Sequence, residues 1–261
     1  MKRPSIQALG SDLLDTTIVE RIACLALPFL TMAGFFWAGS REWWFLALFL
    51  AMVQSFFTYA SVSHDLVHRT LRLPHWLNEG LLALIEGINF RSGHAFRATH
   101  FHHHRHFPDP SDLEGAAARM SWWQALLDGV TAQPRLWWWA FSHSSGGGRV
   151  WIVIEALLVL AGAVVCLFSE TGRVYLAVIL AGSWIFPLMT SYLPHDAGTD
   201  DPERQTRLFR GRVIRWLFFD HLYHLEHHLY PQVPHLRWPE LAKRLDAHFE
   251  AQGLRPIVLF K

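Results

Sequence analysis

The chain has 261 residues, of which 51% are hydrophobic and only 17% are charged, whereas soluble domains carry about 25% charged residues, so the composition favours a membrane protein. The formal net charge is +1 and the basic residues are scattered, so neither nucleic acid nor an acidic partner is indicated. The two cysteines, Cys24 and Cys166, each lie within an apolar run, which argues against a disulfide framework.

Four apolar stretches are long enough to cross a bilayer, which takes about 20 residues of helix. They cover residues 22–39, 43–61, 150–168 and 174–193. The first two are joined by "SREW" and the last two by "SETGR", so each pair is expected to form a tight hairpin. The segments 63–149 and 194–261 then share the other side of the membrane. Because Arg41 and Arg173 are the only basic residues on the short-loop side, the positive-inside tendency predicts that the long segments are cytoplasmic.

Three further helices are predicted outside the spans. Asn78–Phe90 is apolar but too short to span the bilayer and contains Glu86, which indicates a buried or re-entrant helix. Ser121–His143 is rich in tryptophan with polar breaks, as is typical of a helix in the headgroup layer. Residues 238–252 form an amphipathic pattern with Pro239 in the first turn. Residues 1–261 are therefore expected to form one all-α membrane domain with a cytoplasmic helical cap.

The strongest anomaly is the number of histidines, seventeen. Nine of them fall at or beyond the predicted cytoplasmic ends of the spans. They are His64, His68, His100, His103, His104, His195, His224, His227 and His228. The first two are spaced four residues apart and so share one helical face. An H-x-x-H-H pattern then occurs twice, and the four sets can converge because they lie on one side of the membrane.

The tract "THFHHHRHF" contains five histidines, but helical geometry divides them. At about 100° per residue, His100, His103 and His104 fall within an arc of about 100°, while His102 and His106 point to the opposite side. The second H-x-x-H-H pattern, in "HLEHH", gathers its histidines in the same way. Only part of the dense tract is therefore predicted to bind metal.

Converging imidazoles cannot all be charged, and neutral imidazoles bind late first-row transition metals. Because one zinc takes at most four ligands, nine ligands suggest two metal ions, each with room for water or another molecule. Imidazole alone leaves iron, zinc, copper and nickel open, and the chain lacks the Glu-x-x-His pairs of soluble di-iron bundles. His221, one turn before His224, is a weaker candidate ligand.

Carboxylates near the histidines have two predicted roles. Asp65, Asp196 and Asp220 lie close in sequence to predicted ligands and could accept the second ring N–H of a ligand imidazole. Glu155 lies five residues inside the third span and is expected to snorkel to the cytoplasmic interface. No role at the metals is expected for the remaining scattered histidines His75, His94, His143, His235 and His248.

The stretches "HDLVH", "HFHHH" and "HLEHHLYPQVP", placed relative to two membrane hairpins, resemble the three histidine boxes of the integral-membrane fatty acid desaturase and hydroxylase superfamily. The resemblance covers roughly residues 20–245 and is strongest over residues 224–234. It implies that the box histidines hold two irons, which activate dioxygen to oxidise a lipid, and that His195 completes the set. Because no fused cytochrome b5 module is visible, it also implies a separate electron donor, such as ferredoxin or another reductase system.

Two branches of the superfamily resemble this sequence, and each implies a different substrate. "HLEHHLYPQVP" is similar to bacterial acyl-lipid desaturases, whereas "SYLPH" and the compact length resemble carotenoid ketolases and hydroxylases. The first box, H-x-x-x-H, is one residue shorter than in acyl-CoA Δ9 desaturases. Outside the superfamily, a membrane zinc hydrolase and a metal transporter or storage protein are the alternatives. A transporter would place ionisable residues in mid-membrane, where these spans hold almost none.

Overall fold

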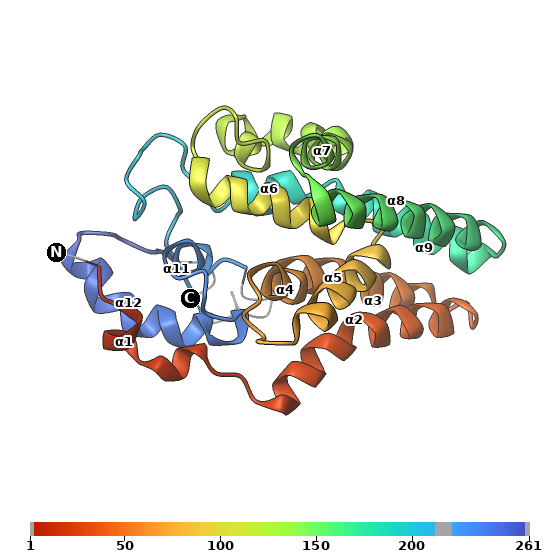
Figure 1. The fold of residues 1–261 in the computed structure, drawn as a ribbon, viewed down its shortest axis with the longest axis horizontal. Helices are drawn as coiled ribbons and strands as arrows, with labels where there is room; N and C mark the ends of the chain where they lie inside the picture. Colours follow the sequence, from red (N-terminus) through yellow and green to blue (C-terminus); the bar gives the residue numbers. More distant parts are fainter. Residues whose placement is uncertain (1–2, 212–220, 259–261) are drawn as a thin grey trace.

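The computed structural model describes residues 3–211 and 221–258. Four helical stretches in it are long and apolar enough to cross a membrane: Ser11–Gly39, Trp44–His68, Gly146–Leu167 and Glu170–Tyr192. Figure 1 shows both hairpins extending to the right, with α11, α12 and the two termini on the left. The predicted all-α fold with four spans in two hairpins is therefore confirmed.

The first hairpin pairs α2 (Ile18–Gly39) with α3 (Trp44–Phe57). A capping box starts α2: the Thr17 hydroxyl accepts from the Glu20 N–H at 3.2 Å, and the Glu20 carboxylate accepts from the Thr17 N–H at 2.8 Å. The reciprocal bonds satisfy backbone donors that would otherwise be unpaired at the start of the helix.

The second span is longer than the sequence predicts. Instead of stopping at Ser61, the helix continues through a π-helical turn, η2 (Thr58–Ser63), into α4 (His64–His68). Arg69, with a left-handed φ of 57°, ends it. The first histidine pair therefore stands on the rigid end of a membrane helix rather than on a loop.

The second hairpin pairs α8 (Gly146–Leu167) with α9 (Glu170–Ser183). The Ser169 hydroxyl caps α9 by accepting an N–H of its first turn at 3.0 Å. A second π-helical turn, η4 (Pro187–Tyr192), extends this span to the segment that carries His195.

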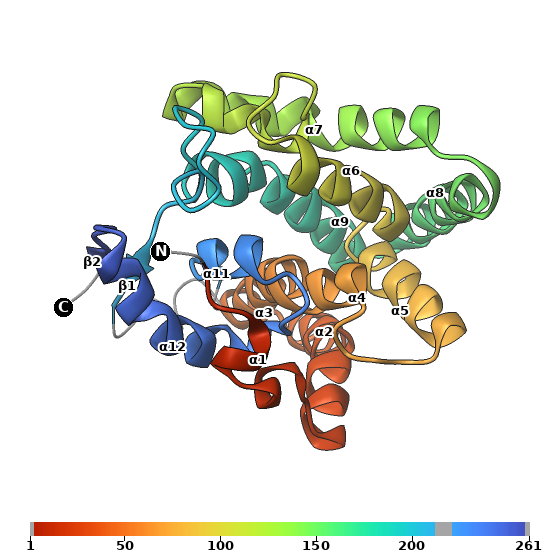
Figure 2. The same ribbon diagram turned by 60° about the vertical axis from the view of Figure 1, so that its left-hand side comes forward.

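Between the hairpins lie α5 (His75–Gly87), α6 (Gly93–His106) and α7 (Trp122–His143). The predicted buried helix is α5, in which Leu82 and Ile85 are fully buried. Figure 2 shows α7 lying across the outer side of α6. Helix α7 therefore covers α6 and also packs directly against the end of the fourth span at η4.

Helix α7 buries small residues and exposes large apolar ones, which is the opposite of a helix on the surface of a soluble protein. Its buried residues are small: Ala125, Gly129, Ala132 and Ala140. Its exposed apolar residues are large: Trp122, Trp123, Leu127, Val130 and Trp138. An outward-facing apolar surface of this kind fits the predicted position in the headgroup layer.

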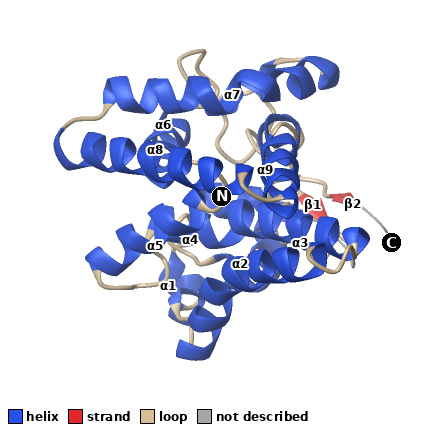
Figure 3. Cartoon of the chain, turned by 90° about the vertical axis from the view of Figure 1, so that its right-hand side faces the viewer, coloured by secondary structure: helices blue, strands red, loops and turns tan. Residues whose placement is uncertain are grey.

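The cap contains α1 (Ile6–Leu9), η1 (Ser11–Leu14), α11 (His224–Leu229), η5 (His235–Arg237) and α12 (Trp238–Ala251). As predicted, α12 is amphipathic, and its buried face packs against α11 and the N-terminal segment. The buried residues at this contact include Leu13, Leu225, Trp238, Leu241, Leu245 and Phe249. Figure 3 shows the only strand pair in the described residues, β1 (Phe209–Arg210) parallel to β2 (Ile257–Val258).

Candidate metal centre

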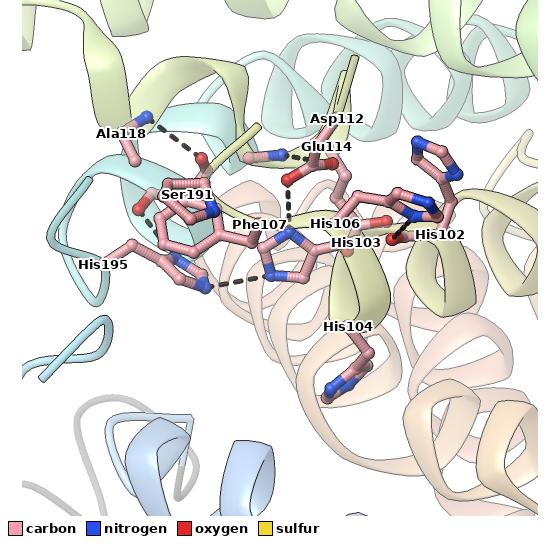
Figure 4. Close-up of polar contacts among 12 residues, drawn as sticks. His102, His103, His104, His106, Phe107, Asp112, Glu114, Ala118, Ser191 and His195 are labelled. Atoms are coloured by element: carbon pink, nitrogen blue, oxygen red, sulfur yellow. Dashed lines mark hydrogen bonds and ion pairs between the residues drawn. The ribbon is translucent and has the colours of Figure 1, made fainter. Parts of the chain in front are cut away.

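Helix α6 divides the histidine tract as its phase predicts. Ser92 caps the helix, its hydroxyl accepting from the Ala95 N–H at 3.0 Å. His103 is 1% exposed and points into the molecule, whereas the His102 and His106 rings stack on each other 3.9 Å apart. Figure 4 shows this pair on the side away from His103 and His195.

Eight of the nine predicted ligands form two groups, and in each group the ring nitrogens lie within 4.8 Å of one another. The first group is His64, His68, His100 and His227. The second group is His103, His195, His224 and His228. Each group combines histidines from at least three separate parts of the chain, so neither exists before the helices pack.

His104, the ninth predicted ligand, lies between the two groups. Its Nε2 atom is 3.0 Å from that of His100 and 2.8 Å from that of His227, both members of the first group. Its ring centre is also 4.4 Å from that of His228 in the second group. His104 is therefore close enough to contribute a nitrogen to either group.

The spacing of the nitrogens suits metal ions. Within the second group, His195 Nε2 lies 3.0 Å from His103 Nε2, 3.2 Å from His224 Nε2 and 3.3 Å from His228 Nε2. Metal–nitrogen bonds of about 2.1 Å in a tetrahedral centre place neighbouring ligand atoms about 3.4 Å apart. The converging lone pairs therefore fit a cation at the middle of each group.

The protonation states agree with that geometry. Burial lowers the pKa of six of these histidines, because desolvation disfavours imidazolium and neighbouring imidazoles add repulsion. They are His100, His104, His195, His224, His227 and His228. A neutral imidazole keeps a free nitrogen lone pair, which is the form that binds a metal.

Comparison with known proteins settles the family. The sequence model of fatty acid desaturases matches residues 41–259, a range that contains all four histidine sets. The chain belongs to the fatty acid desaturase family. This family membership makes it a membrane oxidoreductase of the desaturase or hydroxylase type. No curated protein matches the chain in a direct sequence comparison.

In this desaturase-family chain, two carboxylates that the sequence did not reveal bond to histidines of the second box, "HFHHH". An Asp112 carboxylate oxygen lies 2.7 Å from His103 Nδ1. Glu114, at the start of η3 (Glu114–Arg119), lies 2.7 Å from His100 Nδ1. Each leaves Nε2 free to face the centre, so these carboxylates have the orienting role that was predicted for other residues.

The electrostatics of the two pairs differ. Burial alone would lower the pKa of His103, but the Asp112 carboxylate raises it above the usual value. Burial raises the pKa of Glu114 to about 7. Neither carboxylate has a recognisable spacing from its histidine, since the irregular segment before η3 separates them in sequence. The only sequence hint is that "SDLE" places two carboxylates a few residues after the histidine tract.

The three carboxylates predicted to orient ligands are placed differently. Asp65 is buried and accepts from the His235 Nδ1–H at 2.6 Å and the Thr70 hydroxyl at 2.8 Å. Asp196 is exposed and accepts from the Gly198 N–H at 2.9 Å. The predicted pairing of these two with ligand histidines is therefore wrong in the described residues, because other donors occupy them. Asp220 lies outside the described residues.

A backbone carbonyl, rather than the predicted Asp196 carboxylate, accepts the second ring N–H of His195. His195 Nδ1 donates to the Ser191 carbonyl at 2.9 Å, so η4 itself orients this imidazole (Figure 4). His221, the weaker candidate, has its ring 5.0 Å from that of His224, and its buried Nε2 has no partner among the described residues. Burial lowers the pKa of His221 to about 4.

The expectation for Glu155 is corrected. Glu155 does not snorkel: it is 0% exposed and accepts from His94 Nδ1–H at 2.7 Å. His235 also has a defined role, because it anchors Asp65 beside the first histidine pair. Although burial opposes protonation, the Asp65 carboxylate raises the pKa of His235 to about 10. Local sequence spacing could not reveal either pair, since its members lie 61 and 170 residues apart.

Proposed function

We propose that the chain is a dioxygen-dependent di-iron oxidoreductase that oxidises the alkyl chain of a lipid, with fatty acyl desaturation as the reaction favoured by the third box. The observation that carries the proposal is the pair of four-histidine groups in a chain of the desaturase family. Two nitrogen-rich sites side by side suit two late transition metals.

The nine histidines would hold the two irons. When bound, the irons supply the oxygen activation needed to break an unactivated C–H bond, which side-chain acid–base chemistry cannot achieve. The protein contributes ligand orientation: Asp112 and Glu114 fix box two, and the Ser191 carbonyl fixes His195. Burial of the ligand set excludes water from the reacting centre.

The lipid substrate would enter from the bilayer. An apolar groove of about 430 Å³ opens between α7 and α8, lined by Trp137, Phe141 and Leu157. Trp137 also lines a small inner cavity of about 20 Å³ that includes Phe96 and Thr99. The Phe96 ring lies 5.3 Å from the His100 ring, so Trp137 and Phe96 together connect the groove with the neighbourhood of the histidines.

The active site is proposed to face the cytoplasm. The histidine groups lie at the end of the spans opposite the short loops, and those loops hold Arg41 and Arg173 as their only basic residues. This asymmetry follows the positive-inside tendency. A separate electron donor, such as ferredoxin or another reductase system, would deliver electrons on that side.

Carotenoid ketolation or hydroxylation is the second candidate, because His195 ends the fourth span within "SYLPH". Expression in a host that makes both fatty acids and β-carotene separates the two candidates. Mass spectrometry that finds a new double bond in acyl chains supports desaturation, whereas added oxygen on the ionone ring supports the alternative. Unchanged lipids and pigments in a host with a working electron donor would contradict both.

A further inference from the structure

A carboxylate of the third span is bonded to the start of the box-two helix. Glu155, on α8, contacts the Ser92 hydroxyl and accepts from the His94 backbone N–H at 3.2 Å and from His94 Nδ1–H at 2.7 Å. Ser92 and His94 are the cap and the second residue of α6. Glu155 therefore satisfies donors at the helix start that would otherwise be unpaired.

The hydrogen bonds of His94 and its neighbour Arg97 reach two more helices, α5 and α4. His94 Nε2 lies 2.9 Å from a carboxylate oxygen of Glu79 on α5, and Arg97 on α6 donates to the same carboxylate. Arg97 also donates to the Leu66 carbonyl at 3.0 Å, between the two histidines of α4. One network thus joins α8, α6, α5 and α4.

The network contains charges of both signs. An ionised carboxylate can only accept hydrogen bonds, and Glu79 accepts from Arg69 at 3.2 Å as well as from Arg97. The His94 ring faces Glu155 on one nitrogen and Glu79 on the other, so it links the two carboxylates. Burial alone would raise the pKa of Glu79, but bonds from Arg97 and His94 lower it to about 2. Trp151 stacks parallel to the His94 ring at 4.8 Å, which restricts its orientation.

This network lies close to the ligands along α6. His94 precedes His100 by six residues, a rise of about 9 Å along an α-helix. Because α6 supplies His100 to the first group and His103 to the second, a rotation or shift of its first turn moves ligands of both groups together. Buried charges inside a membrane span are expensive and are retained where they serve a function.

We infer that Glu155 is a positioning residue for the metal centre: through His94, Glu79 and Arg97 it sets the rotation and height of α6 relative to α4, and thereby the separation of the ligands. The inference rests on the proposed function only in taking the two histidine groups as metal sites. Glu155 itself touches none of the nine predicted ligands in the contacts described above.

The test is a Co²⁺ titration of the purified metal-free full chain in lipid nanodiscs, followed by the visible absorption of bound cobalt. The variants are E155A, E155D, E155Q, H94Q and the double variant E155Q/H94Q. E170Q is the matched control, because Glu170 is an exposed acid in the first turn of α9. We expect E155A to bind Co²⁺ at least tenfold more weakly and to change the cobalt absorption bands, whereas E170Q matches the unmodified chain.

The double variant separates positioning from simple loss of stability. E155Q/H94Q changes both partners of one hydrogen bond, so it should lose less Co²⁺ affinity than the two single changes added together. E155D, which keeps the charge, should recover part of the absorption spectrum. Unaltered cobalt affinity and spectrum in folded E155A, or strict additivity in the double variant, would overturn the inference.

The outcome is independent of the enzymatic assay. If the unmodified chain binds two Co²⁺ with the expected sensitivity to Glu155 but oxidises no lipid, the proposed function fails and the positioning role stands. If lipid oxidation is observed while E155A binds cobalt normally, only the positioning role is lost.

Discussion

The Nε2 atoms of His103 and His195 lie 3.0 Å apart although 92 residues separate them in the chain. His103 comes from α6, which is capped by Ser92 and held through Asp112, while His195 follows the π-helical end of the fourth span. They meet where α6, which lies between the two hairpins in sequence, packs against the end of the second hairpin. The candidate metal centre is therefore a product of packing between the two halves of the membrane domain.

Removing one ligand from each group should affect the two sites separately. His227→Ala in the first group and His103→Ala in the second should each abolish lipid oxidation and lower bound metal from two ions to about one per chain, because each ion loses one of about four ligands. Metal analysis of the purified variants checks this. His102→Ala changes the neighbouring residue on the outward face and should leave two ions bound; a loss as large as that of His103→Ala would contradict the division of the tract.

Asp112 should matter through its bond to His103 Nδ1. Asp112→Asn removes the charged acceptor, and loss of such a partner typically weakens metal binding about tenfold to hundredfold. Titration of the metal-free chain measures the affinity. Asp109→Asn serves as the control, because Asp109 is exposed and bonds only to its own turn at Ser111 in the described contacts. Equal affinities in the two variants would show that Asp112 does not orient its histidine.

The His235–Asp65 pair should make stability fall at high pH. The pKa of His235 is about 10 in the folded chain and about 6.5 when unfolded. Because the folded pKa is raised, the stabilisation is fully present below pH 6.5 and is lost as pH rises toward 10. The slope is at most about 1.4 kcal/mol per pH unit.

Thermal unfolding of the metal-free chain at several pH values measures this effect. His235→Gln removes the titrating group, so its melting temperature should vary less between pH 6.5 and 10 than that of the unmodified chain. Parallel curves for the two proteins would show that the pair does not contribute.

Trp137 should control access from the bilayer groove. Trp137→Ala removes the side chain shared by the groove and the inner cavity, so bulkier alkyl chains should be oxidised with a lower KM than in the unmodified chain. Competition between straight and branched lipid substrates measures the change. Trp122→Ala is the control on the same helix, because Trp122 is 60% exposed and lines neither space. If both variants show the same selectivity, entry occurs elsewhere.

Metal identity is tested by removal and replacement. Chelation should abolish lipid oxidation, and Fe²⁺ with a reductant and dioxygen should restore it, while Zn²⁺ should not, because zinc has no redox chemistry. Lipid hydrolysis that needs neither dioxygen nor a reductant, and that zinc restores, would instead favour the membrane zinc hydrolase.

Several features of this protein are local properties that the sequence determines by itself. The spans follow from runs of apolar residues, and the separation of His102 and His106 from the inward-facing histidines follows from the turn of one helix. The apolar run predicts that the second span ends at residue 61, whereas the helix continues through the π-helical turn at Thr58–Ser63 to His68, where the two histidines share a helical face as predicted.

Only the tertiary structure decided which groups meet. The grouping of the histidines into two sets, the bonds of Asp112 and Glu114 to box two, and the burial of Glu155 against His94 all join segments that no spacing rule connects. Asp65 and Asp196 were predicted to orient ligands because they are neighbours in sequence, yet a side chain bonds to whichever donor the fold brings within about 3 Å. Hydrogen-bond partners depend on distance in space, whereas helical phase and hydropathy depend on order along the chain.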